Sequence, residues 1–248
     1  MTSSPEISAP LIGAPPRAAV PDITDIVVVV PAHNERALLP SCLTALDAAV
    51  AGVRVSVQVI VVLDSCDDDS AEIVPDHVTT LHVAARCVGT ARREGFGAAA
   101  PTPADTTWFA TTDADSVVPP DWLRTHVQAA GSGADAFVGI ITPDGFDGWP
   151  PGTATTFARS YDARPGHQHV HGANLGVRAS AYAAAGGFRD LDAHEDVDLV
   201  RRLQETAAHI VWGAEAPVLT STRRSGRTVD GFASYLRQLA DRTPGGSR

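Results

Sequence analysis

Two long runs of β-branched residues constrain the fold of this chain more than any other feature of its sequence. Residues 25–30 form one run, and residues 55–63 form another that ends at Asp64. Continuous apolar runs are typical of strands buried on both faces of a parallel sheet. Apolar residues at helical spacing follow over residues 36–50, where Pro40 fits only near the first turn. This alternation of strands and helices predicts a doubly wound α/β fold.

The rest of the chain continues the alternation less regularly. We expect helices from about residue 70 and over 90–99, and strands over 79–83, 108–111 and 135–141. Residues 143–166 are rich in Gly, Pro and Asp and predict a long loop. Helical patterns return at 179–185, 197–208 and 229–240, and the last carries an apolar stripe that we expect to face the core. We divide the chain into a disordered leader (1–22), a single domain (23–240, with halves 23–130 and 131–240) and a polar tail (241–248).

Charge and cysteine usage exclude several classes of protein. The net charge is −10, which argues against nucleic-acid binding because phosphate neutralisation needs a basic face. All 19 basic residues are arginine, so a P-loop lysine and a Schiff-base lysine are both excluded. Three widely spaced cysteines indicate reduced thiols. No apolar run reaches the ~18 residues of a transmembrane helix, and no secretory signal is evident, so we expect a cytoplasmic protein.

Polar residues follow three of the expected strands. They comprise residues 31–35, residues 64–70 and the pair Asp113 and Asp115. In a parallel sheet these loops meet at the C-terminal edge, where open α/β sheets bind their ligands. Residues i and i+2 of an extended segment point the same way, so both carboxylates can face one divalent cation that phosphates also hold. The alternative is turn and cap chemistry, with Ser70 as a helix N-cap.

Five motifs in this order resemble those of family 2 glycosyltransferases. They are Val-Val-Val-Pro-Ala-His-Asn-Glu (28–35), Val-Val-Leu-Asp-Ser-Cys-Asp-Asp-Asp-Ser (61–70), Ala-Arg-Arg-Glu-Gly (91–95), Asp-Ala-Asp (113–115) and His-Glu-Asp (194–196). The resemblance covers roughly residues 25–240. It implies the GT-A fold, a Rossmann-like three-layer sandwich around a mostly parallel central sheet. It also implies that the first half of the domain binds a nucleotide-sugar donor and the second half an acceptor.

The resemblance assigns roles to residues of the donor half. The loop with Pro31, Ala32 and Glu35 resembles the cradle of the base and ribose, and Asp64 resembles the carboxylate that contacts the base. Arg92 resembles an arginine that faces the nucleotide, although Arg93 stands where the family usually has Asn. Asp113 resembles the ribose-facing acid, and Asp115 the ligand of a Mn²⁺ or Mg²⁺ ion that bridges the diphosphate. A base-facing Asp64 suits uracil, so we favour a UDP-sugar, while guanine and thymine stay open.

Glu195 and Asp196 precede the helical pattern that begins at Val197. One interpretation is a pair of helix N-terminal acids that interact with the helix dipole. In the resembling family, the aspartate that matches Asp196 is a general base, which takes the proton of the acceptor hydroxyl during an inverting transfer. We prefer this second interpretation and place Glu195 on the acceptor side.

A histidine-rich segment, residues 167–174, allows three interpretations. If the segment is extended, His167, His169 and His171 share one face and could bind zinc. The segment could also be a solvated loop. We prefer a wall of the acceptor site, because residues 172–174 resemble the acceptor-side loop of the family. His171, Gly172 and Asn174 are our acceptor-side residues.

The basic cluster at residues 223–227 predicts either a diphosphate lid, formed by Arg224 and Arg227, or a solvated turn. The chain lacks the Gln-x-x-Arg-Trp motif of processive synthases, which together with the lack of a membrane span favours transfer of one sugar. The acceptor stays open between a small molecule, a lipid-linked intermediate and a protein side chain.

Two other functions compete with glycosyl transfer. Residues 113–117 also fit the nucleophile loop of haloacid-dehalogenase-like phosphatases, although that loop normally opens the chain and its family needs a lysine. A non-catalytic nucleotide-sugar-binding protein is the second alternative, which the retained Asp115 and Asp196 disfavour. A nicotinamide-dependent dehydrogenase is disfavoured because no G-x-G-x-x-G follows the first strand.

Overall fold

The computed structural model describes residues 20–99, 103–224, 226 and 231–242. Its strands are β1 (Asp25–Ala32), β2 (Ser56–Asp64), β3 (Thr79–Val83), β4 (Thr107–Thr111), β5 (Ser116–Val117), β6 (Ala136–Pro143), β7 (Leu175–Arg178) and β8 (Ile210–Thr220). Its α-helices are α1 (Leu39–Ala51), α2 (Val88–Gly97), α3 (Trp122–Gly131), α4 (Thr153–Ser160), α5 (Ala179–Ala184), α6 (Glu195–Glu205) and α7 (Phe232–Asp241), and its 3₁₀ turns are η1 (Asp69–Ile73) and η2 (Gly172–Asn174).

One sheet runs through both halves of the chain in the order β3-β2-β1-β4-β7-β6-β8-β5. β1 pairs in parallel with β2 and β4, and β2 pairs in parallel with β3. β7 is antiparallel to both β4 and β6, β6 is parallel to β8, and β5 is antiparallel to β8. All strands except β7 and β5 therefore point the same way. This arrangement confirms the α/β fold with a mostly parallel central sheet.

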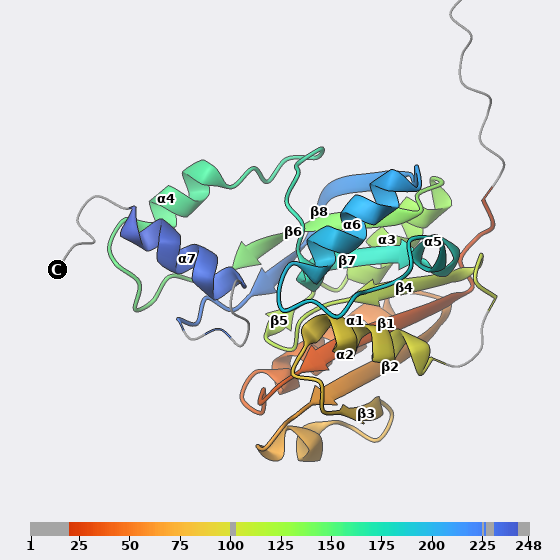
Figure 1. The fold of residues 1–248 in the computed structure, drawn as a ribbon, viewed down its shortest axis with the longest axis horizontal. Helices are drawn as coiled ribbons and strands as arrows, with labels where there is room; N and C mark the ends of the chain where they lie inside the picture. The colour runs from red at the N-terminus through yellow and green to blue at the C-terminus, as the bar shows by residue number, and fades with distance from the viewer. Residues whose placement is uncertain (1–19, 100–102, 225, 227–230, 243–248) are drawn as a thin grey trace, which may run out of the picture.

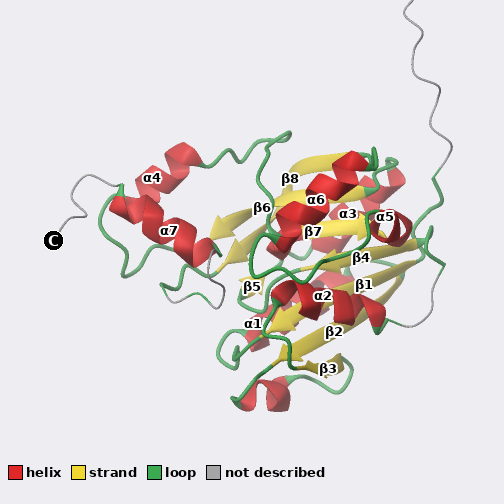
Figure 2. Cartoon of the chain, in the orientation of Figure 1, coloured by secondary structure: helices red, strands yellow, loops and turns green. Residues whose placement is uncertain are grey.

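Helices cover the sheet on both faces, giving three layers (Figures 1 and 2). The side chains of β1 show how the two cores form. Val28 and Val30 enter a cluster with residues of α1 and α3, whereas Val27 and Val29 enter a second cluster with residues of α2, α5 and α6. A strand that is apolar on both faces can separate two cores, which is why the β-branched run occupies the middle of the sheet.

The predicted loop over residues 143–166 is wrong in its middle, because α4 forms there. Pro150, Pro151 and Gly152 conceal the helix in the sequence, and Gly152 adopts φ 90° just before it. α4 is stabilised by tertiary packing: Phe157 is buried, and its ring lies 6.1 Å from the ring of Phe232 on α7. α4 and α7 lie together beyond the ends of β6 and β8 (Figure 1).

Four further helices and strands were missed by the sequence analysis: α3, β5, β7 and β8. In β8, Gly213 and Pro217 interrupt the apolar pattern, and the register against β6 shifts between Gly139 and Ile141. Gly213 is required there, because an added Cβ would lie 2.3 Å from Cε2 of Phe137. The helix expected from residue 70 is the short turn η1. Residues 1–19 of the expected leader and 243–248 of the expected tail lie outside the described residues. Within the part that the structure describes, no helix is long and apolar enough to span a bilayer.

Candidate functional site

The polar loops after β1, β2 and β4 meet at one edge of the sheet, as expected for neighbouring parallel strands. A cleft of about 770 Å³ opens at this edge, and elements of the second half close its other side. It is lined by eleven of the residues singled out in the sequence, namely Pro31, Ala32, Glu35, Asp64, Arg92, Asp113, Asp115, His171, Gly172, Glu195 and Asp196. The structure therefore brings together the predicted residues of both halves.

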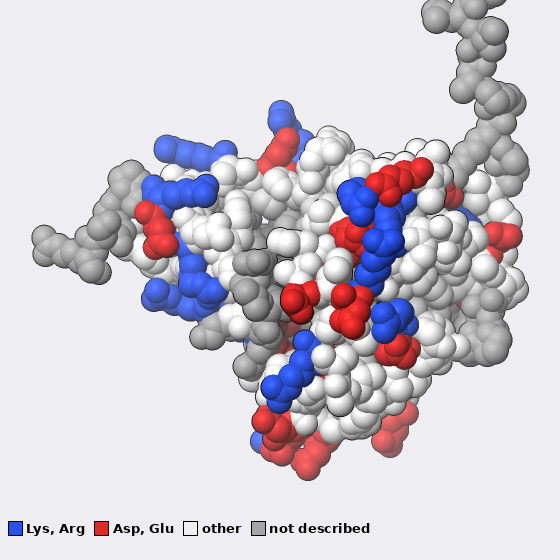
Figure 3. Space-filling model, in the orientation of Figure 1, with Lys and Arg blue, Asp and Glu red and all other residues white. Residues whose placement is uncertain are grey.

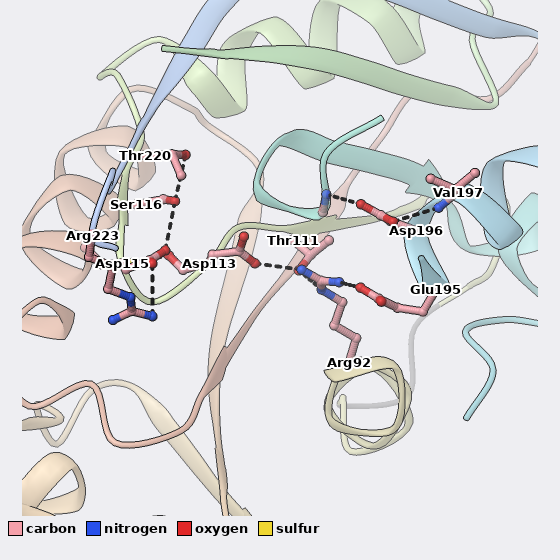
Figure 4. A network of polar contacts seen from close by, with 12 residues as sticks. Arg92, Thr111, Asp113, Asp115, Ser116, Glu195, Asp196, Val197, Thr220 and Arg223 are labelled. Atoms are coloured by element: carbon pink, nitrogen blue, oxygen red, sulfur yellow. Dashed lines mark hydrogen bonds and ion pairs between the residues drawn. The ribbon is translucent and has the colours of Figure 1, made fainter. Parts of the chain in front are cut away.

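Arg92 on α2 links the two sides of the cleft (Figure 4). Its guanidinium donates to Thr111 Oγ1 at 3.2 Å, to Asp113 Oδ1 at 2.6 Å and to Glu195 Oε1. An added Cβ at Gly172 would lie 2.2 Å from Arg92 Nη2, so only glycine fits against it. Burial alone would lower the pKa of Arg92, but the neighbouring carboxylates raise it, so the guanidinium stays charged. For Glu195 the directions are reversed: burial raises the pKa of its carboxyl group, and the charge of Arg92 opposes that rise.

Asp196 lies in the first turn of α6 with its carboxylate at the cleft. Oδ2 accepts the Gly172 N–H at 2.7 Å, and Oδ1 accepts the Val197 N–H at 2.8 Å. His194, just before the helix, adopts φ 60°, an uncommon backbone conformation for a non-glycine residue and one that clusters at functional sites. Each carboxylate oxygen keeps a free lone pair. Asp196 is thus fixed in orientation and keeps the capacity to accept a further hydrogen bond.

Asp64 ends β2 and organises the loop that precedes α2. Its Oδ1 accepts the N–H groups of Ala85 and Arg86, each at 2.8 Å, and its Oδ2 accepts the Cys87 N–H at 2.9 Å. Ser65 and Arg86 both have positive φ, at 55° and 50°. One lone pair on Oδ2 is left for a ligand. The observed contacts make Asp64 first of all the residue that shapes this wall of the cleft.

Arg223 enters the cleft from the segment after β8. It belongs to the basic cluster predicted as a possible lid, although Arg224 and Arg227 were the arginines selected from that cluster. Its guanidinium donates to both carboxylate oxygens of Glu35, at 2.5 and 2.6 Å, and lies 3.1 Å from Asp115 Oδ2. Burial and the nearby Asp113 raise the pKa of Asp115 to about 7, and Arg223 opposes that rise. The sequence did not show which arginine of the cluster enters the cleft, because β8, which ends at Thr220, was missed.

Three predicted features lie elsewhere than expected, and a fourth, Arg227, cannot be compared. Asn174 is buried in the core, where its amide accepts from Trp122 Nε1 at 2.9 Å and donates to the backbone carbonyls of Ile140 and Ala216. Arg224 lies over the Trp149 ring, 5.5 Å from its centroid, and does not line the cleft. Arg227 lies outside the described residues. Ser70 is not the N-cap of η1: Asp68 accepts the Ser70 N–H there, and Ser70 Oγ instead accepts the Glu35 N–H at 2.9 Å.

The histidine segment does share one face, since its three rings stack in a column with centroids 5.8 and 6.1 Å apart. Their nitrogens have separate partners: His167 contacts Gly213 O, His169 accepts the Asp162 N–H and His171 contacts the Tyr161 hydroxyl. No group of three metal-ligating side chains occurs among residues 20–99, 103–224, 226 and 231–242. Because His169 and His171 line the cleft, the column forms part of its wall.

Similar solved structures share this fold. Two structures of S. aureus TarS spanning residues 1–349 match with TM-scores of 0.61 (with UDP-GlcNAc) and 0.58 (with UDP), at 13% and 12% identity. A further TarS structure matches with a TM-score of 0.62 at 12% identity. Each match covers 87% of this chain and, in that order, 65%, 69% and 42% of the other. This chain thus spans less than two thirds of the first of them.

The sheet order, the three layers and the acids at the sheet edge define a protein of the GT-A fold class. The sequence profile of "Glycosyl transferase family 2" matches residues 27–191. The chain belongs to glycosyl transferase family 2, which contradicts the phosphatase and dehydrogenase alternatives. Comparison with curated protein sequences gives no match.

Proposed function

We propose that this protein is a metal-dependent, inverting glycosyltransferase that moves one sugar from a nucleotide-diphosphate sugar to an acceptor hydroxyl. One observation carries the proposal: Asp113 and Asp115 after β4 and Asp196 on α6 face the same cleft, and Arg92 joins the two sides. A donor held by the first pair would present its anomeric carbon toward Asp196.

The site suits a divalent cation that takes only part of its coordination from the protein. Asp115, with Asp113 beside it, would hold Mn²⁺ or Mg²⁺, since such ions commonly use one or two carboxylates together with substrate phosphates. The raised pKa of Asp115 supports this, because a buried carboxylate beside Asp113 is short of positive charge despite Arg223. When bound, the cation would stabilise negative charge on the departing nucleotide diphosphate.

A uridine nucleotide is the donor we favour. Two of the similar structures are complexes of TarS with UDP-GlcNAc and with UDP, which supports a uridine nucleotide as the donor. In this chain the base would lie against Pro31 and Asp64, where Asp64 Oδ2 can accept one N–H from a base edge.

Asp196 would act as the general base. Its carboxylate accepts the proton of the acceptor hydroxyl, whose oxygen attacks the anomeric carbon. The bond from that carbon to the diphosphate oxygen breaks on the opposite side, and the nucleoside diphosphate leaves with the electron pair. Attack from the opposite side inverts the configuration. Glu195, held by Arg92, fixes the start of α6 and with it the position of Asp196.

The donor site is tested by a thermal-shift panel of UDP, GDP, dTDP and CDP, each with and without Mn²⁺. A ligand that binds only the native state raises the melting temperature. We expect one nucleotide, UDP, to stabilise the wild type in a Mn²⁺-dependent way and to lose this effect in Asp115→Asn. No shift with any nucleotide would remove the basis for a metal-dependent transferase.

The base is tested by Asp196→Asn, with Glu205→Gln on the exposed face of the same helix as its matched control. An amide keeps the shape of the side chain but cannot take the proton, so we expect transfer to fall by roughly 10²–10⁴-fold while UDP binding persists. Glu205→Gln should retain transfer at the wild-type rate. Wild-type-like transfer by Asp196→Asn would sink the assignment, and loss of UDP binding would point to a structural role instead.

A further inference from the structure

The cleft has an end that the proposed donor machinery does not use, and aromatic rings line it. Tyr161, His169 and His171 come from the segment after α4, and Phe232 and Tyr235 come from α7; we call these five residues the aromatic wall. The Tyr161 and His169 rings stack with centroids 4.2 Å apart, and the Phe232 and Tyr235 rings stack at 6.2 Å. The Phe157 ring packs against both groups and holds them together.

Exposed apolar side chains occur inside the cleft. Three large hydrophobic side chains are exposed among the described residues: Val197 at 44%, Leu219 at 39% and Tyr235 at 38%. Val197 and Tyr235 line the cleft, whereas Leu219 does not. An apolar surface left open inside a concave site is the usual mark of a ligand that covers it.

The wall is joined directly to the residue proposed as the base. His171 precedes Gly172, whose N–H holds Asp196 Oδ2 at 2.7 Å, and Val197 follows Asp196 in α6. An acceptor whose hydroxyl reaches Asp196 would therefore lay the rest of its body on these rings.

The charges at this end do not suit an anion. Burial lowers the pKa of His171 to about 3, so its ring is neutral, and burial raises the pKa of Tyr161 to about 12, so its hydroxyl is also neutral. Among the described residues, Asp196 lines the cleft beside Glu195, which is paired with Arg92, and Asp162, which follows Tyr161, is paired with Arg164. Basic side chains gather over α4 and α7 in Figure 3. Arg159 on α4 and Arg237 on α7 do not line the cleft.

We propose that the acceptor is an uncharged alcohol with an apolar ring, which packs on the aromatic wall and presents its hydroxyl to Asp196. This inference rests on the proposed glycosyl transfer and narrows its acceptor. It favours an aromatic or alicyclic aglycone over an acceptor that carries a phosphate, because a phosphate here would be desolvated beside a carboxylate.

Three matched probes test the proposal by binding alone. Methyl β-D-glucoside lacks a ring aglycone, p-nitrophenyl β-D-glucoside has one, and p-nitrophenyl β-D-glucoside 6-phosphate adds charge. Calorimetry with and without UDP and Mn²⁺ gives each dissociation constant. We expect the nitrophenyl compound to bind about three- to tenfold more tightly than the methyl compound, as an aromatic contact provides. We expect its 6-phosphate to bind more weakly than the uncharged parent.

Variants locate the contact. Tyr235→Ala should abolish the preference for the nitrophenyl ring, and Val197→Ser, at an exposed position that folding tolerates, should reduce it. Leu219→Ala removes exposed apolar surface outside the cleft and should leave the preference intact. Equal binding of the two uncharged glucosides, tighter binding of the 6-phosphate, or an unchanged preference in both cleft variants would overturn the proposal.

A thermal shift with UDP and Mn²⁺ on the same samples separates two kinds of failure. A UDP shift without a ring preference overturns the acceptor inference and leaves the proposed function standing. A missing UDP shift contradicts the proposed donor site itself, and the acceptor assignment falls with it.

Discussion

At the scale of single residues, Arg223 and the proposed cation would compete for the same carboxylate. Arg223 lies 3.1 Å from Asp115 Oδ2 and also forms a bidentate pair with Glu35, which is buried. A guanidinium cannot lose its charge, so it offsets part of the repulsion between Asp115 and Asp113 at any working pH. A divalent cation arriving with a diphosphate would take over that task and leave Arg223 free to contact phosphate oxygens.

Arg223→Gln should therefore bind Mn²⁺ more tightly than the wild type when no nucleotide is present. Loss of one positive charge beside Asp115 should lower the Mn²⁺ dissociation constant by about tenfold. Without metal, the same change should lower the free energy of unfolding, because the buried Glu35 carboxylate loses its two bonds to Arg223. Calorimetric Mn²⁺ titration and urea unfolding measure both effects. The matched control is Arg224→Gln, the next arginine, which lies on Trp149 outside the cleft. Mn²⁺ affinity that is unchanged or weaker in Arg223→Gln would contradict this competition.

At the scale of elements, α2 depends on a close approach to the sheet. Gly95 faces β1 and β2, and an added Cβ would lie 2.6 Å from Val29 Cγ1 and 2.8 Å from Val62 Cγ2. α2 also carries Arg92, so the distance between α2 and the sheet determines whether the Arg92 guanidinium reaches Asp113 and Glu195. The Ala-Arg-Arg-Glu-Gly motif thus holds both the functional arginine and the glycine that positions it.

Gly95→Ala should destabilise the protein even though alanine is the better helix former. Overpacking two β-branched side chains costs about 1–3 kcal/mol, which exceeds the gain of ~1 kcal/mol in helix propensity. Gly97→Ala is the control in the same helix: its added Cβ meets nothing within 4 Å, so it should stabilise or be neutral. Urea unfolding followed by circular dichroism compares the two variants. Similar effects at both positions would show that the packing argument for Gly95 is wrong.

The sequence predicted those elements whose pattern is local and missed those that tertiary contacts create. The apolar runs of β1 and β2 could be recognised because a strand buried on both faces is apolar at successive positions. The acids that follow these runs stand out against them. β8 could not be recognised, because Gly213 and a register shift interrupt its pattern. Gly213 is required by the ring of Phe137 on the neighbouring strand, a contact that the sequence does not show. The same limit explains the site. Asp113 and Asp115 follow a recognisable strand, and Asp196 begins a recognisable helix. The basic cluster at 223–227 was also recognised, but which of its arginines enters the cleft depends on the course of the missed strand β8. Asn174 lies in the core because its amide bonds Trp122.

At the scale of the whole molecule, a buried histidine on a covering helix contacts the sheet that positions the cleft. His126 on α3 lies in the core, with its ring 4.8 Å from that of Trp122 and 4.9 Å from that of Phe137. Its Nδ1 accepts the Trp108 Nε1–H at 3.0 Å. The contacts of this ring join α3 to β4 and to β6. Burial lowers the pKa of His126 from 6.5 to about 3, so the folded protein holds the ring neutral.

Stability should therefore fall with acid through this histidine. Below pH 6.5 the unfolded chain binds a proton at residue 126 that the folded protein refuses until about pH 3, so the contribution is complete above pH 6.5 and is lost as the pH falls. Asp115, whose pKa is raised to about 7, acts in the opposite direction, because its folded form binds a proton first.

His126→Gln keeps an acceptor for Trp108 but cannot titrate, and it shares the Asp115 contribution with the wild type. The difference in unfolding free energy between the two should thus isolate His126. From urea unfolding at pH 7.5, 6, 5 and 4.5, we expect the variant to be less stable at pH 7.5 and to lose this deficit by up to about 1.4 kcal/mol per pH unit below 6.5. Parallel stability curves for the two proteins would mean that His126 is not held neutral by the fold.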